Sequence, residues 1–181
     1  PTVPAYAQAP IVTFGSPVDG SVVAAGQELT ISVSFAEGAS PIDPLRTKVL
    51  VGGQDWSTRF VKTGIGATLS LSSNEPLVGG PLAIHAEVVD RAGEIGSATT
   101  SILVVPSLAQ VQGNGFPGLS VAVFAQGLSP TASANELIFT SAGGGTVSAP
   151  FDSVSADRRR GTVTVPVDAA SGNVQLKVNN T

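Results

Sequence analysis

Residues 29–35 read LTISVSF, with hydrophobic side chains at Leu29, Ile31, Val33 and Phe35 and hydroxyl side chains between them. Alternation at a period of two is typical of a β-strand that buries one face. The same period returns in further segments, which are 82–88, 102–104, 121–123, 163–165 and 174–178. No stretch of ten or more residues carries the i, i+3, i+4, i+7 hydrophobic face of a helix. The sequence therefore predicts an all-β chain without crossover helices, which favours antiparallel over parallel sheets.

Turn-forming residues separate these segments. The 181-residue chain contains 21 glycines and 13 prolines, and only 12% of its residues are charged. Turn signals stand at 17–20, 52–53, 79–81, 91–93, 143–145 and 171–173. Because short strands joined by tight turns build sandwiches, the predicted architecture is two tandem immunoglobulin-like β-sandwiches.

The length and the order of the segments predict two domains. At roughly 150 residues per domain, 181 residues hold one large domain or two small ones. One predicted strand ends at Val105, where Pro106 follows, and a new series of strands is expected after Gly113-Asn114-Gly115. Charge supports this division, because residues 11–105 hold five basic and nine acidic residues whereas 106–181 hold four of each. We therefore expect three segments, which are a linker at 1–10, one sandwich at 11–105 and a second at 106–181.

Composition argues against several classes of function. The chain has no cysteine, which excludes disulfides, thiolate zinc sites and cysteine nucleophiles. Its net charge of −4 lacks the basic excess of nucleic-acid binders, so no nucleic-acid partner is expected. No hydrophobic run approaches the roughly 18 to 20 residues that span a bilayer, so no membrane insertion is expected. The absence of methionine indicates an exported mature chain or a piece of a longer protein.

Landmarks in both halves of the chain are shared with known families. In the first half they are Ser16-Pro17, Asp19-Gly20, the strand at 29–35, Gly52-Gly53, and Asp90 with Ala92-Gly93 before the last strand. With these, the first half resembles the bacterial immunoglobulin-like modules that occur in tandem on secreted and surface proteins. In the second half they are Asn135 before the strand at 137–139, and the segment 163–166 followed by Ala169, Gly172 and a final strand. With these, the second half resembles an IPT/TIG domain, which is also immunoglobulin-like.

Candidates for catalysis are few. His85 is the only histidine, and it is expected on the solvent face of a strand because Ile84 and Ala86 point the other way. No G-x-S-x-G sequence marks a serine nucleophile, and most acidic residues stand in turns, where no pairing across a cleft is indicated. We expect no enzyme, no catalytic residue and no cofactor.

Calcium is the metal that the loops could best hold, because carboxylates and backbone carbonyls are its preferred ligands. The candidates are Asp90 and Glu94 in the segment DRAGEIG, with Asp19 or Asp43 as a third ligand from another loop. The alternative is that Asp90 forms an Asx turn and holds a tight hairpin. The Asx turn is favoured, so calcium stays a secondary hypothesis.

Two further segments are candidates for partner or ligand contact. Arg158, Arg159 and Arg160 form the only basic cluster, which we interpret as a solvated turn facing an acidic neighbour. Relatives of IPT/TIG domains contact DNA through loops, but three arginines offer fewer phosphate contacts than the roughly six to ten of a strong binder. Trp56 could stack on a sugar ring, although packing on the same strand face as Thr58 and Phe60 is favoured.

These patterns predict a non-catalytic module of a larger bacterial protein, secreted or on the cell surface. Its expected role is to space, present or dock, with neighbouring domains of the same chain or another surface protein as partners. Two alternatives stay open. The first is a carbohydrate-binding accessory module of a secreted hydrolase, with a polysaccharide as partner, and the second is an adhesin segment made rigid by calcium.

Overall fold

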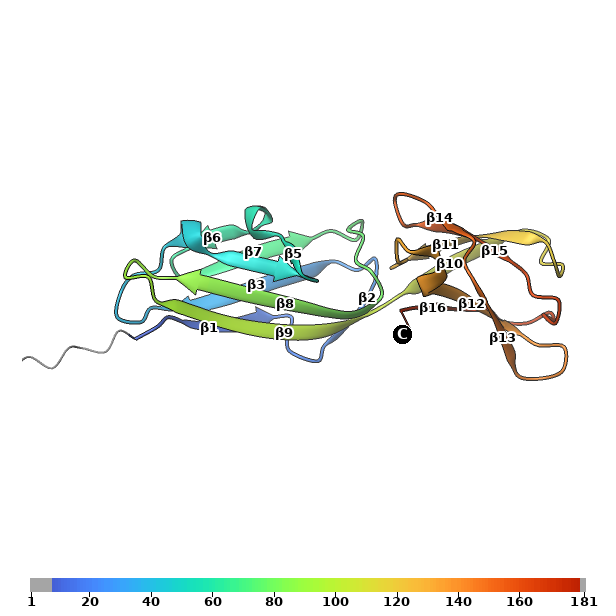
Figure 1. The fold of residues 1–181 in the computed structure, drawn as a ribbon, viewed down its shortest axis with the longest axis horizontal. Coiled ribbons are helices and arrows are strands. Elements are labelled where there is room, and N and C mark those ends of the chain that lie inside the picture. Colours follow the sequence, from blue (N-terminus) through green and yellow to red (C-terminus); the bar gives the residue numbers. More distant parts are fainter. Residues whose placement is uncertain (1–7, 180–181) are drawn as a thin grey trace, which may run out of the picture. The chain divides into compact units, whose positions relative to one another are not determined.

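The computed structural model describes residues 8–179 and shows an all-β chain (Figure 1). Of the expected linker at 1–10, residues 1–7 lie outside the described part, and the Gln8 carbonyl accepts a hydrogen bond of 2.9 Å from the Ala39 N–H. Three short 3₁₀ helices interrupt the strands, which are η1 (Pro44–Arg46), η2 (Ser57–Arg59) and η3 (Ala132–Ala134). No helix in residues 8–179 has the length and hydrophobicity needed to cross a membrane.

The chain forms two compact units. Within the described residues, unit 1 comprises the chain up to Ser21 together with Glu28–Leu71 and Pro81–Ile102. Unit 2 comprises Val22–Gln27, Ser72–Gly80 and the chain from Leu103 onward. Two short segments from the first half of the sequence therefore belong to the second unit.

The first sandwich contains a four-stranded and a five-stranded sheet. The four-stranded sheet has the order β1 (Ile11–Ser16), β3 (Leu29–Ala36), β7 (Gly66–Leu71) and β6 (Val61–Thr63). The five-stranded sheet has the order β2 (Val22–Ala24), β9 (Ile95–Val105), β8 (Gly80–Val89), β4 (Lys48–Val51) and β5 (Gln54–Asp55). The predicted strand at 29–35 is confirmed as β3, in which Leu29, Ile31, Val33 and Phe35 are buried and face the core.

One strand pair corrects the expectation of antiparallel sheets. Strand β2 pairs with β9 in parallel, from Val22 opposite Leu103 to Ala24 opposite Val105, so the residues paired between these two strands are those that belong to unit 2. Parallel neighbours need a crossover of a dozen residues or more. Here the long connection from Ala25 to Glu94, which contains other strands, supplies that crossover without an α-helix.

The second sandwich has two sheets around one core. The four-stranded sheet has the order β10 (Ser107–Gln112), β11 (Ser120–Gln126), β15 (Arg160–Thr164) and β14 (Ser153–Val154). The three-stranded sheet has the order β13 (Thr146–Pro150), β12 (Asn135–Thr140) and β16 (Gln175–Val178). Val123 and Val163 from the first sheet pack with Leu137 and Val178 from the second, and all four are fully buried. Two sheets around a common core confirm the predicted fold class of immunoglobulin-like β-sandwiches.

Strand β10 starts earlier than the sequence predicted. The new series of strands was expected after Gly113-Asn114-Gly115, yet β10 begins at Ser107. Its register with β11 shifts between Leu108 and Gln110, so the hydrophobic alternation is broken. The strand also lies at the edge of its sheet, where Leu108 and Val111 are half-buried and its other side chains are exposed.

Candidate functional site

A cavity of about 450 Å³ opens at one end of the second sandwich. Its floor is formed by Val121, Phe139 and Val165, all buried. The β10–β11 loop supplies one wall, including Phe116, whose side chain is 65% exposed. The β15–β16 connection supplies the other wall, with Val174 at its end. We call this cavity the unit 2 groove.

The β10–β11 loop takes its shape from glycines in the sequence GNGFPG. Gly113 has a φ of 139° and Gly118 a φ of 80°, in the region that side chains rarely adopt. A Cβ on Gly113 would also lie only 3.0 Å from a methyl group of Val121. The Gly118 N–H donates to the Val165 carbonyl at 2.9 Å, which joins this loop to the end of β15. The loop thereby holds Phe116 at the edge of the groove.

The chemistry of the unit 2 groove is neutral and mostly hydrophobic. Among its lining residues, Asn114 and Ser171 carry the polar side chains, and no lining side chain is acidic, basic or a thiol. Such a site can bury hydrophobic groups and offer backbone hydrogen bonds, but its lining holds no group for general acid–base catalysis. Sequence reasoning missed this site, although an exposed Phe-Pro pair between glycines is the signal that could have indicated it.

Two members of the arginine cluster, Arg158 and Arg159, lie in the turn between β14 and β15, and Arg160 is the first residue of β15. The three side chains have separate environments. Arg159 Nη2 donates to both the carbonyl oxygen and the side-chain oxygen of Asn74, each at 2.9 Å. The Arg160 guanidinium lies 5.9 Å from the centre of the Phe124 ring, at cation–π distance. Arg158 has a left-handed backbone with a φ of 57°. Arg159 thus holds the 72–80 segment of unit 2 through the uncharged Asn74, the neighbour of the acidic Glu75.

Asp157 organises this turn. Its Oδ1 accepts hydrogen bonds from the Ser155 hydroxyl at 2.6 Å and from the Arg159 N–H at 3.2 Å. These bonds, led by the one from Ser155, lower the pKa of Asp157 below its ordinary value of 3.8. A shallow cavity of about 360 Å³ beside the turn is lined by both Asp157 and Arg160, so it presents opposite charges.

Trp56 does not lie in a strand, which corrects the expected packing on one strand face with Thr58 and Phe60. It precedes η2, and only Phe60 of these three is buried. The Arg59 guanidinium lies 4.3 Å from the centre of the Trp56 ring and covers one of its faces. The preceding Asp55 accepts from the Ser57 hydroxyl and backbone N–H, which lowers its pKa. No signal in the sequence indicated the 3₁₀ turn, because Thr58 and Arg59 suit a strand equally well.

The acidic candidates for calcium are held by their own loops. Asp90 is fully buried, and its Oδ1 accepts from the Glu94 N–H at 2.8 Å. This bond spans four residues and not the two of an Asx turn, and it holds the connection between β8 and β9. Its Oδ2 has no hydrogen-bond partner. Asp19 Oδ1 instead accepts from the Ser101 N–H, and Asp43 Oδ1 caps η1 at Leu45. Within residues 8–179, no three acidic or histidine side chains gather in a way that could hold a metal ion.

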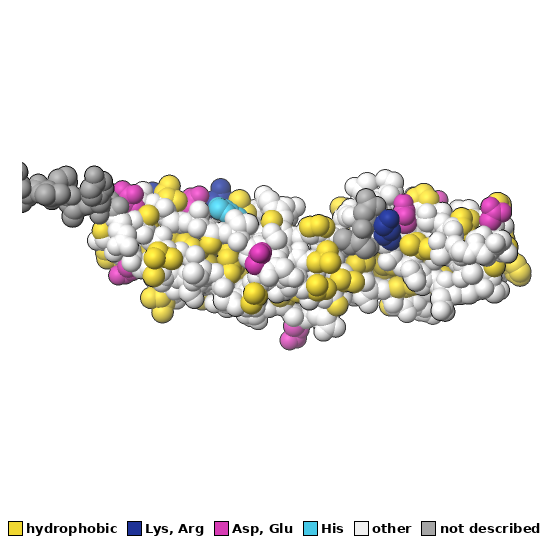
Figure 2. Space-filling model, turned by 90° about the horizontal axis from the view of Figure 1, so that it is seen from below, with side chains coloured by type: hydrophobic (Ala, Val, Ile, Leu, Met, Phe, Trp, Pro, Cys, Tyr) yellow, Lys and Arg dark blue, Asp and Glu magenta, His cyan; other side chains and the backbone are white. Residues whose placement is uncertain are grey.

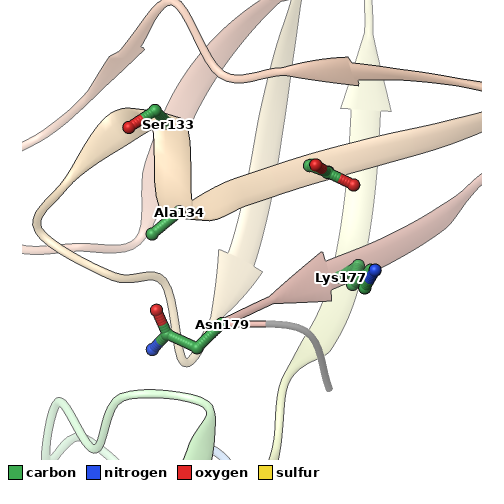
Figure 3. A pocket seen from close by; sticks show the side chains of 5 residues that line it. Ser133, Ala134, Lys177 and Asn179 are labelled. Atoms are coloured by element: carbon green, nitrogen blue, oxygen red, sulfur yellow. The ribbon is translucent and has the colours of Figure 1, made fainter.

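His85 and the polar pocket near β16 complete the set of candidate sites. His85 is half-exposed, and its Nδ1 lies 2.9 Å from the Thr99 hydroxyl. The polar pocket has a volume of about 200 Å³, and Figure 3 shows Lys177 and Asn179 on one side with Ser133 and Ala134 on the other. Asn179 Nδ2 donates to the Gly79 carbonyl within unit 2 at 2.9 Å. On the face drawn in Figure 2, the few charged side chains are scattered among hydrophobic and neutral atoms.

Comparisons with known proteins return structures but no relatives in sequence. No family model and no curated protein matches the chain. An endo-β-1,4-mannanase from Thermotoga petrophila is similar at 12% identity and a TM-score of 0.45, over 54% of this chain and 20% of that chain. The fibronectin(III)-like modules of Clostridium thermocellum CbhA are similar at 21% identity and a TM-score of 0.41, over 52% of this chain and 96% of theirs. A tetra-tandem repeat from the extending region of a large adhesion protein is similar at 18% identity and a TM-score of 0.45, over 94% of this chain and 44% of that chain.

Proposed function

We propose that the chain is a non-catalytic interaction module of a secreted or cell-surface bacterial protein. In this role it docks neighbouring domains or another surface protein. The observation that carries the proposal is the unit 2 groove, a cavity of about 450 Å³ with a neutral lining and the exposed Phe116 at its edge. An exposed aromatic side chain beside a hydrophobic cavity is the kind of surface that anchors a protein partner.

The polar residues of the chain support the same role. Three charged side chains hold loops in place by hydrogen bonds to backbone or amide groups. Arg159 donates to Asn74, Asp157 accepts from the Arg159 N–H, and Asp19 accepts from the Ser101 N–H. These contacts give the two sandwiches stable loop conformations. The assignment of 11–105 to a bacterial immunoglobulin-like module and of 106–181 to an IPT/TIG-like domain belongs to this proposal.

Selection of peptides on the immobilised chain tests the proposal. We expect selection from a random peptide library to enrich hydrophobic sequences. Their affinity should fall at least about tenfold when Phe116→Asp places a charge at the edge of the groove. Ile65→Asp is the matched control, because Ile65 is 77% exposed and lies in unit 1.

Two results would contradict the proposed function. One is that no peptide is enriched on the folded chain. The other is that the enriched peptides bind wild type and Phe116→Asp equally, because their site would then lie outside the unit 2 groove.

A further inference from the structure

One wall of the unit 2 groove contains the sequence Asn114-Gly115, in the β10–β11 loop. Deamidation of an asparagine begins when the backbone nitrogen of the next residue attacks the side-chain amide. Glycine hinders this approach least, because it has no side chain. The chain contains no other Asn-Gly pair, and its one Asp-Gly pair, Asp19-Gly20, can form the same cyclic imide. These two pairs can therefore be compared within one molecule.

Asn114 and Gly115 are held by no other group. Asn114 is exposed and lies outside the strands, between the end of β10 and the turn at 117–118. Among residues 8–179, neither the Asn114 side chain nor the Gly115 N–H has a hydrogen-bond partner. A Cβ built on Gly115 would meet no atom within 4 Å apart from its chain neighbours, so this part of the loop borders open space. The attacking nitrogen and the amide carbon can thus approach each other.

The related pair Asp19-Gly20 is held at both reacting groups. The Gly20 N–H donates to the Ser101 carbonyl at 2.8 Å, and Asp19 Oδ1 accepts from the Ser101 N–H at 2.8 Å. The nitrogen that would attack and the carboxyl that would be attacked are both bound to strand β9. The folded structure therefore protects this pair and leaves Asn114-Gly115 open.

The other described asparagines are less suited to the reaction. Asn74, Asn135 and Asn179 each use the side-chain amide group in hydrogen bonds. Asn173 is as exposed as Asn114, but the β-branched Val174 follows it and hinders the attack. Asn173 is therefore the matched control within the chain.

We propose that Asn114 is a deamidation site and that its modification closes the unit 2 groove to hydrophobic partners. The Gly115 nitrogen loses its proton to a solvent base and attacks Cγ of Asn114. The N–Cγ bond forms, the Cγ–Nδ2 bond breaks, and the leaving nitrogen takes up a proton and departs as ammonia. Residues 114 and 115 then share a five-membered imide, and water adds to one of its two carbonyls and opens the ring. Water is the only co-reactant, and nothing is oxidised or reduced.

Ring opening gives two products. Cleavage at Cγ leaves aspartate at position 114 with an ordinary backbone. Cleavage at the other carbonyl leaves isoaspartate, in which the main chain runs through Cβ and Cγ and is one methylene longer. Both products place a carboxylate in a groove lining that has no charged side chain before the reaction.

The new charge finds no basic partner in the groove walls. Residues 111–121 and 165–174 contain no lysine or arginine, and their one charged residue is Asp168. A hydrophobic group that docks beside an unpaired carboxylate removes water from it, which costs free energy. Isoaspartate also lengthens the loop that holds Phe116, whose far end stays fixed by the Gly118 bond to the Val165 carbonyl. The effect on docking rests on the proposed function, whereas the deamidation itself does not.

Incubation of the full chain in ¹⁸O-labelled water at mildly alkaline pH tests the chemistry. Peptide mapping by mass spectrometry follows, at each asparagine, the loss of ammonia and the gain of labelled water. We expect Asn114 to convert at least about tenfold faster than Asn173. Its rate should lie within about threefold of the rate in a synthetic peptide of residues 111–119, because the fold does not hold the pair. Isoaspartate at position 19 should form in the urea-unfolded chain and not in the folded chain.

Two variants test the consequence for docking. Asn114→Gln keeps an amide, but the attack would need a six-membered ring, so this variant should not convert and should bind the hydrophobic library peptides as wild type does. Asn114→Asp carries the charge from the start and should bind them at least about threefold more weakly. Incubated wild type should show a similar loss, whereas incubated Asn114→Gln should keep its affinity.

The possible failures can be told apart. Conversion at least about tenfold slower in the folded chain than in the peptide would overturn the deamidation site, as would equal conversion of Asn114 and Asn173. Conversion at Asn114 with unchanged peptide affinity of the incubated chain and of Asn114→Asp would overturn the effect on docking. If no library peptide binds any variant, the proposed function fails, while the mass data still decide the deamidation site.

Discussion

Asn135 offers a quantitative test of how unit 2 is held together. Its side chain is 0% exposed and fastens the 129–132 loop to the start of β12. Oδ1 accepts from the Ser129 N–H at 2.7 Å, and Nδ2 donates to the carbonyls of Ser129, Thr131 and Ala132 at 3.0, 2.9 and 3.2 Å. Asn135→Ala removes all four bonds in one step.

The expected cost follows from which of these groups water can reach. Ser129 is buried at 6% exposure, so its N–H and C=O lose their partners without replacement. Thr131 is exposed, and its carbonyl can bond to water. Each unsatisfied buried group costs about 1–3 kcal/mol, so Asn135→Ala should lower the free energy of unfolding of unit 2 by about 2–6 kcal/mol. This is a large part of the roughly 5–15 kcal/mol that a domain has.

The assay must report on unit 2 by itself. Trp56, the only tryptophan, lies in unit 1, so its fluorescence follows the wrong sandwich. Urea unfolding followed by two-dimensional NMR signals of β11 and β12 resolves unit 2. The midpoint should fall by at least about 0.7 M, since m is about 1–3 kcal/mol/M.

Two controls fix the interpretation of this result. Asn135→Asp keeps the side-chain volume but places an acceptor against three carbonyls. It should therefore lower the free energy of unfolding at least as much as Asn135→Ala. Because this variant leaves no cavity, that result would exclude cavity formation as the cause. Asn173→Ala, at an exposed position, should change the free energy of unfolding by less than about 0.5 kcal/mol. A loss below about 0.5 kcal/mol for Asn135→Ala would refute the reasoning.

Four other predictions follow from the loops. Arg158→Gly should stabilise unit 2 by about 1 kcal/mol in urea unfolding, because Arg158 has a φ of 57°, and a destabilised variant would contradict this. The lowered pKa of Asp157 stabilises the folded state above the ordinary value of 3.8, so wild type and Asp157→Asn should differ in stability at pH 7 and converge as pH falls below 3.8; a gap independent of pH would exclude this. Chelation should leave the melting temperature unchanged, because no third acidic ligand joins Asp90 and Glu94 in the described part of the chain, whereas a rise with added calcium would favour the calcium hypothesis. Trp56 fluorescence should stay flat across a polysaccharide panel, because Arg59 covers one ring face; saturable quenching would favour carbohydrate binding.

The parts of the fold that the sequence predicted are those with strict alternation on a buried face. Ile31 and Val33 in β3 show it, and so do Ile84 and Ala86 in β8, which lie between half-buried or exposed residues. Strand β10 was not predicted, because its bulge interrupts the alternation of hydrophobic residues at the edge of the sheet. The local pattern carries the signal only where one face is consistently buried.

Features that depend on distant contacts were beyond sequence reasoning. The parallel pairing of β2 with β9 joins segments about 80 residues apart, and no local pattern encodes it. The bonds of Arg159 to Asn74 likewise depend on the 72–80 segment belonging to unit 2. The unit 2 groove is lined by two loops that are distant in sequence. The one local feature of the sequence that could have indicated the groove was therefore Phe116.

Backbone amide signals of the residues that line the unit 2 groove give the most direct test of the docking surface. In a ¹⁵N NMR titration of the full chain with a peptide enriched by the library selection, we expect the largest shifts at Val111, Phe116 and Val174. The same titration of Phe116→Asp should show these shifts only at peptide concentrations at least about tenfold higher. Shifts confined to unit 1, or equal titrations of wild type and Phe116→Asp, would contradict docking at the groove.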